Sequence, residues 1–119
     1  MFTCFIRYRI EPGKRDAFKD YARSWISLIR KYGGTHHGYF VPPAADDAVP
    51  RAAFSFPGIG TDGPPNVAVA LFSFPSVEAY ERYRTEVAQD EDCRAATVRF
   101  EETKCFSSYE RTFLMPVFE

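Results

Sequence analysis

Residues 66–74 are apolar on both faces of the strand that they predict. Val67, Val69 and Leu71 alternate with a second set that faces the other way, namely Ala68, Ala70, Phe72 and Phe74. A strand with one face in water alternates apolar and polar side chains, so this strand must lie in a sheet covered on both faces. Helices can cover one face. A chain of 119 residues is too short to supply a second sheet, so we expect a second copy of the chain to cover the other.

The residues before this strand change their hydrophobic period twice. Residues 2–10 alternate with period two, which predicts a strand whose helix-facing side carries Phe2, Cys4, Ile6, Tyr8 and Ile10. Over residues 14–32 the apolar positions recur at three- and four-residue steps, which predicts a helix. Gly33 and Gly34 end that helix, and residues 35–41 predict the second strand.

The residues after the strand at 66–74 predict two further helices and a last strand. Ser76 and Asp90 are suitable N-caps for these helices, the second of which extends to residue 102. Residues 105–115 predict the fourth strand. This order of elements predicts a single α+β domain over residues 1–119, of ferredoxin-like βαββαβ type, with an antiparallel sheet in the order 4-1-3-2. Residues 43–65 are rich in Pro, Gly and Ala and predict a long loop between strands two and three, either mobile or closing over a pocket.

Composition excludes several kinds of partner. The net charge is −1 and no basic stripe is present, so we expect no binding to nucleic acid. No apolar stretch approaches the roughly 20 residues that span a bilayer, so we expect no membrane association. The N-terminus lacks a secretory pattern, and the three cysteines are widely spaced, which favours reduced thiols in the cytoplasm. Their spacing predicts no metal site, and no motif indicates a cofactor.

Four strings of the sequence are similar to the NIPSNAP family, which lies within the dimeric α+β barrel superfamily. They are Ile10-Glu11-Pro12-Gly13-Lys14, Gly33-Gly34-Thr35-His36-His37-Gly38-Tyr39-Phe40, Ala70-Leu71-Phe72-Ser73-Phe74-Pro75-Ser76 and Tyr109-Glu110-Arg111-Thr112-Phe113-Leu114-Met115-Pro116. The resemblance implies a homodimer joined through its sheet faces. It implies no particular activity, because a fold of this kind supports unrelated functions.

His36 and His37 are the two histidines of the chain, and they are the candidate catalytic residues together with Tyr8. Neighbouring residues on a strand point to opposite faces, so one imidazole should face the helices and the other the partner or solvent. The inward histidine is the candidate general acid or base. The alternative is a structural histidine bonded to a tyrosine or to the backbone.

Tyr8, Trp25 and Phe40 are the predicted ligand-binding residues. Tyr8 and Trp25 should both face the space between the sheet and the first helix, where a phenol can donate a hydrogen bond and an indole can form the wall of an aromatic slot. The alternative is that these aromatic residues only fill the core.

Arg7, Arg9 and Arg111 lie on predicted strands. Arg7 and Arg9 share the face of Phe5, so we expect them to form ion pairs with carboxylates across the dimer interface. The alternative role for these arginines is to hold a carboxylate of a substrate.

Three functional hypotheses follow. The first is a homodimeric protein that binds a small apolar or aromatic molecule between sheet and helices. The second is a cofactor-independent monooxygenase or isomerase. The third is a protein-interaction module with an exposed aromatic surface.

Overall fold

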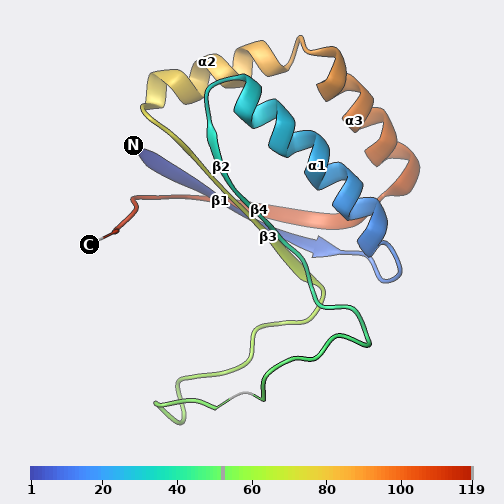
Figure 1. The fold of residues 1–119 in the computed structure, drawn as a ribbon, viewed down its shortest axis with the longest axis vertical. Helices are drawn as coiled ribbons and strands as arrows, with labels where there is room; N and C mark the ends of the chain where they lie inside the picture. Colours follow the sequence, from blue (N-terminus) through green and yellow to red (C-terminus); the bar gives the residue numbers. More distant parts are fainter. Residues whose placement is uncertain (52, 119) are drawn as a thin grey trace.

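The computed structural model describes residues 1–51 and 53–118 and shows one antiparallel sheet with all three helices on the same side (Figure 1). The elements in chain order are β1 (Phe2–Ile10), α1 (Arg15–Lys31), β2 (Thr35–Phe40), β3 (Val67–Phe74), α2 (Val77–Val87), α3 (Glu91–Thr103) and β4 (Phe106–Leu114). The strand order is β2-β3-β1-β4. Read from the other edge this is 4-1-3-2, so the ferredoxin-like prediction is confirmed.

The helix boundaries depend on the local signals noted in the sequence. The Ser76 side chain accepts a hydrogen bond from the backbone N–H of Ala79 and caps α2, and Asp90 caps α3 in the same way through the N–H of Asp92. Gly33 ends α1 with a φ of 91°, a left-handed conformation that suits glycine. Because each cap satisfies backbone groups that the helix leaves free, these ends follow from short stretches of sequence.

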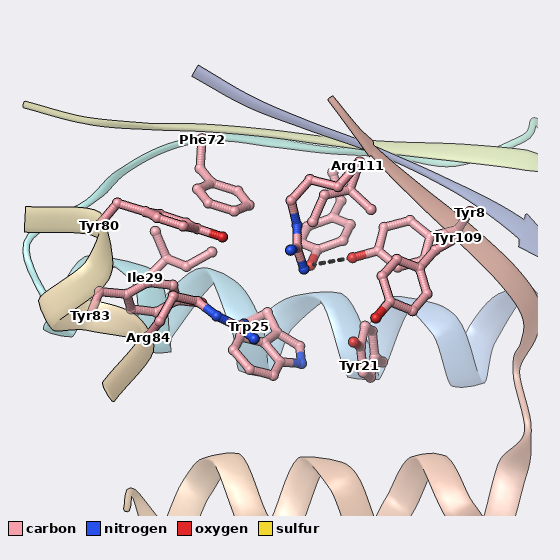
Figure 2. A pocket seen from close by; sticks show the side chains of 12 residues that line it. Tyr8, Tyr21, Trp25, Ile29, Phe72, Tyr80, Tyr83, Arg84, Tyr109 and Arg111 are labelled. Atoms are coloured by element: carbon pink, nitrogen blue, oxygen red, sulfur yellow. Dashed lines mark hydrogen bonds between the residues drawn. The ribbon is translucent and has the colours of Figure 1, made fainter. Parts of the chain in front are cut away.

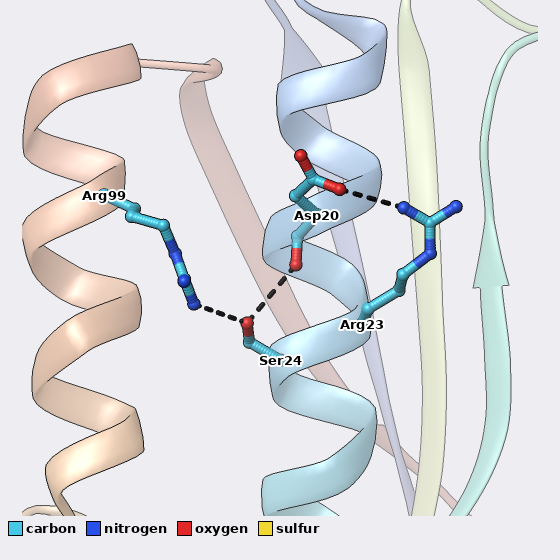
Figure 3. A network of polar contacts seen from close by, with 4 residues as sticks. All are labelled: Asp20, Arg23, Ser24 and Arg99. Atoms are coloured by element: carbon cyan, nitrogen blue, oxygen red, sulfur yellow. Dashed lines mark hydrogen bonds and ion pairs between the residues drawn. The ribbon is translucent and has the colours of Figure 1, made fainter.

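Asp90 also joins the end of α1 to the start of α3. Its carboxylate accepts hydrogen bonds from the Lys31 ammonium at 2.7 Å and from the Tyr32 hydroxyl. These two bonds hold the pKa of Asp90 well below its usual value. Farther along, Arg99 of α3 donates to the Ser24 hydroxyl of α1 at 2.9 Å (Figure 3). The two helices are therefore bound to each other at the end of α1 and again near its middle.

Aromatic rings fill the space between the sheet and α1. The Tyr8 ring on β1 meets the Phe18 ring of α1 edge to face at 5.1 Å and the Phe106 ring of β4 at 4.9 Å. Phe18 and Phe74 are fully buried in the same core. Edge-to-face packing of this kind adds roughly 0.5–1.5 kcal/mol per pair to the effect of burial.

The opposite side of the sheet carries no helix (Figure 1). Phe5 of β1 and Val69 and Leu71 of β3 point to this outer face and keep part of their surface exposed. Phe40 of β2, paired with Val69, is 55% exposed there. The described chain thus leaves a row of apolar side chains on the outer face without cover.

The segment 43–65 joins β2 to β3, and its described residues contain no helix or strand. It extends beyond the ends of these strands and away from the helices (Figure 1). The turns in it are local, such as the bond from the N–H of Ala44 to the carboxylate of Asp47. None of the described helices is long and apolar enough to cross a membrane.

Replacing Gly34 with alanine is expected to destabilise the protein by about 1–3 kcal/mol, because the core has no room for a methyl group there. A Cβ at Gly34 would lie 2.6 Å from Cγ2 of Ile29 and 2.8 Å from Cζ of Phe74, and both of these side chains are buried. Thermal unfolding checks this. Gly63→Ala is the matched control, since nothing lies within 4 Å of the added atom; equal melting temperatures for the two variants would contradict the prediction.

Candidate functional site

A cavity of about 150 Å³ lies between the inner face of the sheet and α1, and α2 closes one end of it (Figure 2). Its wall comes from six elements and is mostly aromatic. The lining residues are Ile6, Tyr8, Tyr21, Trp25, Ile29, Tyr39, Phe72, Tyr80, Tyr83, Arg84, Tyr109 and Arg111. A wider, more open hollow between α1, α3 and β4 shares Tyr21, Trp25 and Tyr109 with this cavity.

Six of the seven tyrosines of the chain line this cavity. Burial raises the pKa of the Tyr8, Tyr21, Tyr39 and Tyr83 phenols far above the usual value. These phenols are therefore protonated at neutral pH, and they offer hydrogen-bond donors rather than bases. Among the described residues, no carboxylate and no imidazole lines the cavity.

The structure brings Tyr8 and Trp25 together at the cavity, as the sequence predicts. Tyr8 is 4% exposed, and its hydroxyl lies 3.5 Å from the hydroxyl of Tyr39. Trp25 stands on the α1 side of the cavity next to Tyr21, with ring centroids 6.3 Å apart. Nε1 of Trp25 is buried and has no hydrogen-bond partner among the described residues. This indole is therefore an unused donor beside the cavity.

His36 is the histidine that faces the helices. It is 8% exposed, and its ring stacks on that of Tyr39 at 5.1 Å, which places it behind the cavity wall rather than in it. Burial, with smaller effects from Arg30 and His37, lowers the pKa of His36 from 6.5 to about 4. The imidazole is therefore neutral at physiological pH.

A backbone contact decides which nitrogen of His36 carries the proton. The N–H of Gly38 donates to Nδ1 at 2.9 Å, so Nδ1 must be the acceptor and Nε2 the protonated nitrogen. Nε2 is buried without a partner in the described chain. The lone pair that a general base needs is thus already engaged, and the geometry suits His36 to donate a hydrogen bond rather than to accept a proton.

A β-bulge on β2 changes the expected place of Phe40. His36 pairs with Phe72 and Gly38 with the next residue of β3, Leu71, so His37 is an extra residue in the ladder. Gly38 allows this with a φ of 116°. The bulge returns Tyr39 to the helix-facing side and turns Phe40 outward. Phe40 therefore does not line the cavity, and Tyr39 does so in its place.

His37 lies on the outer face, away from the cavity. Its Nε2 is 2.8 Å from the Ser73 hydroxyl, which is itself 2.7 Å from the hydroxyl of Thr3. Ser73 is buried, so no substrate can approach its oxygen. These three side chains form a hydrogen-bonded chain across β2, β3 and β1. His37 therefore lies on the opposite face of the sheet from His36 and Tyr8.

Arg7 pairs with a carboxylate of its own chain, whereas the sequence predicts an ion pair across the dimer interface. Its guanidinium lies 2.8 Å from the carboxylate of Glu110, because these residues are directly opposite each other on β1 and β4. Arg111 points the other way. It pairs with Ile6 on the helix-facing side of the sheet, and it lines the cavity.

The sequence did not predict that Tyr39, Tyr80 and Tyr109 line the cavity, nor that Arg84 and Arg111 both border it. Part of the signal was present. Tyr80 and Arg84 are four residues apart on α2, and Tyr109 and Arg111 are two apart on β4, so each pair shares a face. Which faces meet is a tertiary property. In the part of the chain that the structure describes, no three metal-ligating side chains form a group.

The family model for NIPSNAP matches residues 3–45 and 51–118. An uncharacterized NIPSNAP domain protein from Burkholderia xenovorans is 20% identical over 99% of this chain and 96% of its own, with a TM-score of 0.70. A NIPSNAP family protein of unknown function from Agrobacterium tumefaciens is 18% identical over 100% of this chain and 91% of its own, with a TM-score of 0.70.

A more distant solved structure, from Nitrosomonas europaea, carries the name of a candidate antibiotic biosynthesis monooxygenase. It is 12% identical over 99% of this chain and 100% of its own, with a TM-score of 0.58, which is a likeness of fold. No curated protein matches the sequence. Since the family model covers all but residues 46–50 of the long loop and the terminal residues 1, 2 and 119, this chain belongs to the NIPSNAP family.

Proposed function

We propose that this protein binds a small, single-ring aromatic molecule in the cavity between its sheet and α1. The observation that carries the proposal is the concentration of six tyrosines and the single tryptophan around one space of about 150 Å³. Natural cores hold few voids larger than a water molecule, so a space of this size is suited to a ligand. A dry cavity of about 150 Å³ is known to accept a benzene-sized ligand, so one ring fits.

We further propose that the protein does this as a homodimer whose outer sheet faces pack against each other. The uncovered apolar row of Phe5, Val69 and Leu71 supports this, since exposed apolar surface of this kind marks an interface. The three thiols, none of them in a disulfide, suit the cytoplasm. A protein-interaction module would use the same face for a different protein, and the dimer measurement described in the Discussion distinguishes the two.

Catalysis is the second candidate function, because the cavity places several buried proton donors around the proposed ligand. A cofactor-independent monooxygenase or an isomerase must first remove a proton from its substrate. In residues 1–51 and 53–118, the cavity wall offers no carboxylate or imidazole for that step. Binding is therefore what the wall supports best, and an enzyme of this design would need a substrate that arrives ionised.

Titration with benzamide, a neutral single-ring probe, is expected to change the fluorescence of Trp25 in a saturable way. Trp25 is the one tryptophan of the chain and lines both this cavity and the neighbouring hollow, so its emission reports binding in this region and the cavity-filling variant below identifies the site. Naphthalene-2-carboxamide, which has two rings, should bind more weakly because the cavity holds one ring.

A filled cavity provides the control. Ile6→Phe adds volume on the floor of the cavity and should abolish the benzamide response, whereas Ile6→Leu keeps the volume and should retain it. A response that survives in the Ile6→Phe variant would place the probe elsewhere and contradict the proposal.

A further inference from the structure

Two arginines face the proposed ligand from opposite sides. Arg84 extends from α2 toward Trp25, and Arg111 descends from β4 into the space between the sheet and α1 (Figure 2). The ion pairs of the described residues are Arg7–Glu110, Arg23–Asp20, Lys31–Asp90 and Lys104–Glu101. Neither arginine of the cavity takes part in one. Two cations thus border a cavity whose lining, in the part of the chain that the structure describes, includes no acidic residue.

The position of Arg111 is unusual for a strand of this sheet. It lies on the helix-facing side, opposite Ile6, where the neighbouring strands carry apolar and aromatic residues. A guanidinium placed beside a hydrophobic core normally has a carboxylate partner or reaches water. Arg111 is exposed to solvent and has no carboxylate partner in the described chain, so its guanidinium is available to a negative group of a ligand in the cavity.

The charges of Arg84 and Arg111 both affect the pKa of groups inside the protein. Burial raises the pKa of Tyr80, and the guanidinium groups of Arg111 and Arg84 both act against that rise. They also oppose the effect of burial on the pKa of Cys4 of β1. The two guanidinium groups thus favour negative charge at Tyr80 and Cys4, which is the direction that an anionic ligand in the cavity needs.

The buried polar atoms without partners are also donors. Of the described residues, Trp25 Nε1 and His36 Nε2 are the two cases, and the contact from Gly38 makes Nε2 of His36 an N–H. Trp25 lines the cavity, while His36 lies behind Tyr39. A buried donor without an acceptor is costly, and a ligand with acceptor oxygens beside Trp25 would remove that cost.

We infer that the ligand is a monocyclic aromatic carboxylate. Its ring occupies the tyrosine-lined cavity, and its carboxylate lies between Arg84 and Arg111. This inference rests on the proposed binding function and specifies its ligand class. Planar guanidinium groups match the geometry of a carboxylate, and these two would hold one beside the tyrosine rings of a cavity sized for one ring.

The test compares benzoate, benzamide and benzylammonium, which share the ring and differ in charge. Trp25 fluorescence gives the dissociation constant of each in the full-length protein. Benzoate is expected to bind at least about tenfold more tightly than benzamide, the effect of one charge-assisted hydrogen bond, and benzylammonium more weakly than either. Raising the salt concentration should weaken benzoate binding and leave benzamide binding unchanged.

Arg84→Gln and Arg111→Gln should each weaken benzoate binding by about tenfold or more and leave benzamide binding unchanged. The matched control is Arg82→Gln, which removes the same charge from the same helix at an exposed position outside the cavity. It should alter neither constant.

The outcomes separate the two proposals. If benzamide binds as tightly as benzoate, or if Arg82→Gln weakens benzoate as much as Arg84→Gln does, the anion inference fails and the binding function remains. If neither probe changes Trp25 fluorescence, the binding function itself fails and the inference fails with it.

Discussion

Replacing Phe5 with lysine is expected to convert the protein from a dimer of about twice 13.6 kDa into a monomer of 13.6 kDa at micromolar concentration. Phe5 lies on β1 in the middle of the outer face, next to Leu71 of β3 and Thr112 of β4. If two sheets pack face to face, this position is near the centre of the interface. A stable interface of this type typically buries about 2,000 Å² or more.

The size of the effect follows from symmetry. A two-fold dimer contains Phe5 twice, and loss of each buried ring costs about 1.5–3 kcal/mol. The sum of about 3–6 kcal/mol raises the dissociation constant by roughly a hundredfold or more, before the cost of two buried ammonium groups is counted.

Sedimentation equilibrium or light scattering measures the association directly. Ser27→Lys is the matched control, because it adds the same charge at an exposed position of α1 on the helical side of the molecule. It should leave the dimer intact. A wild-type mass of 13.6 kDa would exclude the dimer, and equal dissociation of both variants would show that the outer sheet face is not the interface.

The second large effect is a loss of stability in mild acid that depends on His36. The pKa of this imidazole is lowered from 6.5 to about 4 in the folded protein. The unfolded chain therefore binds a proton near pH 6.5, while the folded chain resists it until about pH 4. The stability contributed by neutral His36 is complete above pH 6.5 and is lost progressively as the pH falls to about 4.

The loss from this residue is at most about 3 kcal/mol, because a pKa lowered by one pH unit corresponds to roughly 1.4 kcal/mol and nearby solvent screens part of the effect. The cause is physical and local. The ring is enclosed between Tyr39 and Phe72, and its Nδ1 already accepts the N–H of Gly38, so a second N–H on the ring would be buried facing a donor.

His36→Asn isolates the contribution. The Asn side-chain oxygen can accept the same bond from the N–H of Gly38, two residues on, and it does not titrate. Urea unfolding at a fixed protein concentration, repeated between pH 6.5 and pH 4, should show a steeper loss for the wild type than for the variant. Carboxylates that titrate in the same range are common to both proteins and cancel in the comparison. Parallel curves would contradict the low pKa.

The sequence by itself determined the elements of this protein and their order. Periods of two and 3.6 residues, the caps at Ser76 and Asp90 and the stop at Gly33 depend on interactions within a few residues, so they can be derived without knowing the fold. The sheet order followed as well, because the rules for short and right-handed connections leave few alternatives. The inward position of Tyr8 followed from simple alternation along β1.

The tertiary structure alone decided the composition of the candidate site. A bulge at His37 exchanged Phe40 for Tyr39 at the cavity, and a single extra residue in a ladder reverses every side chain beyond it. Arg84 and Arg111 are 27 residues apart in sequence numbering and line the same cavity because α2 and β4 both border it. This shared position depends on how the helix lies against the sheet, which is a property of the assembled core and not of any local stretch of the chain.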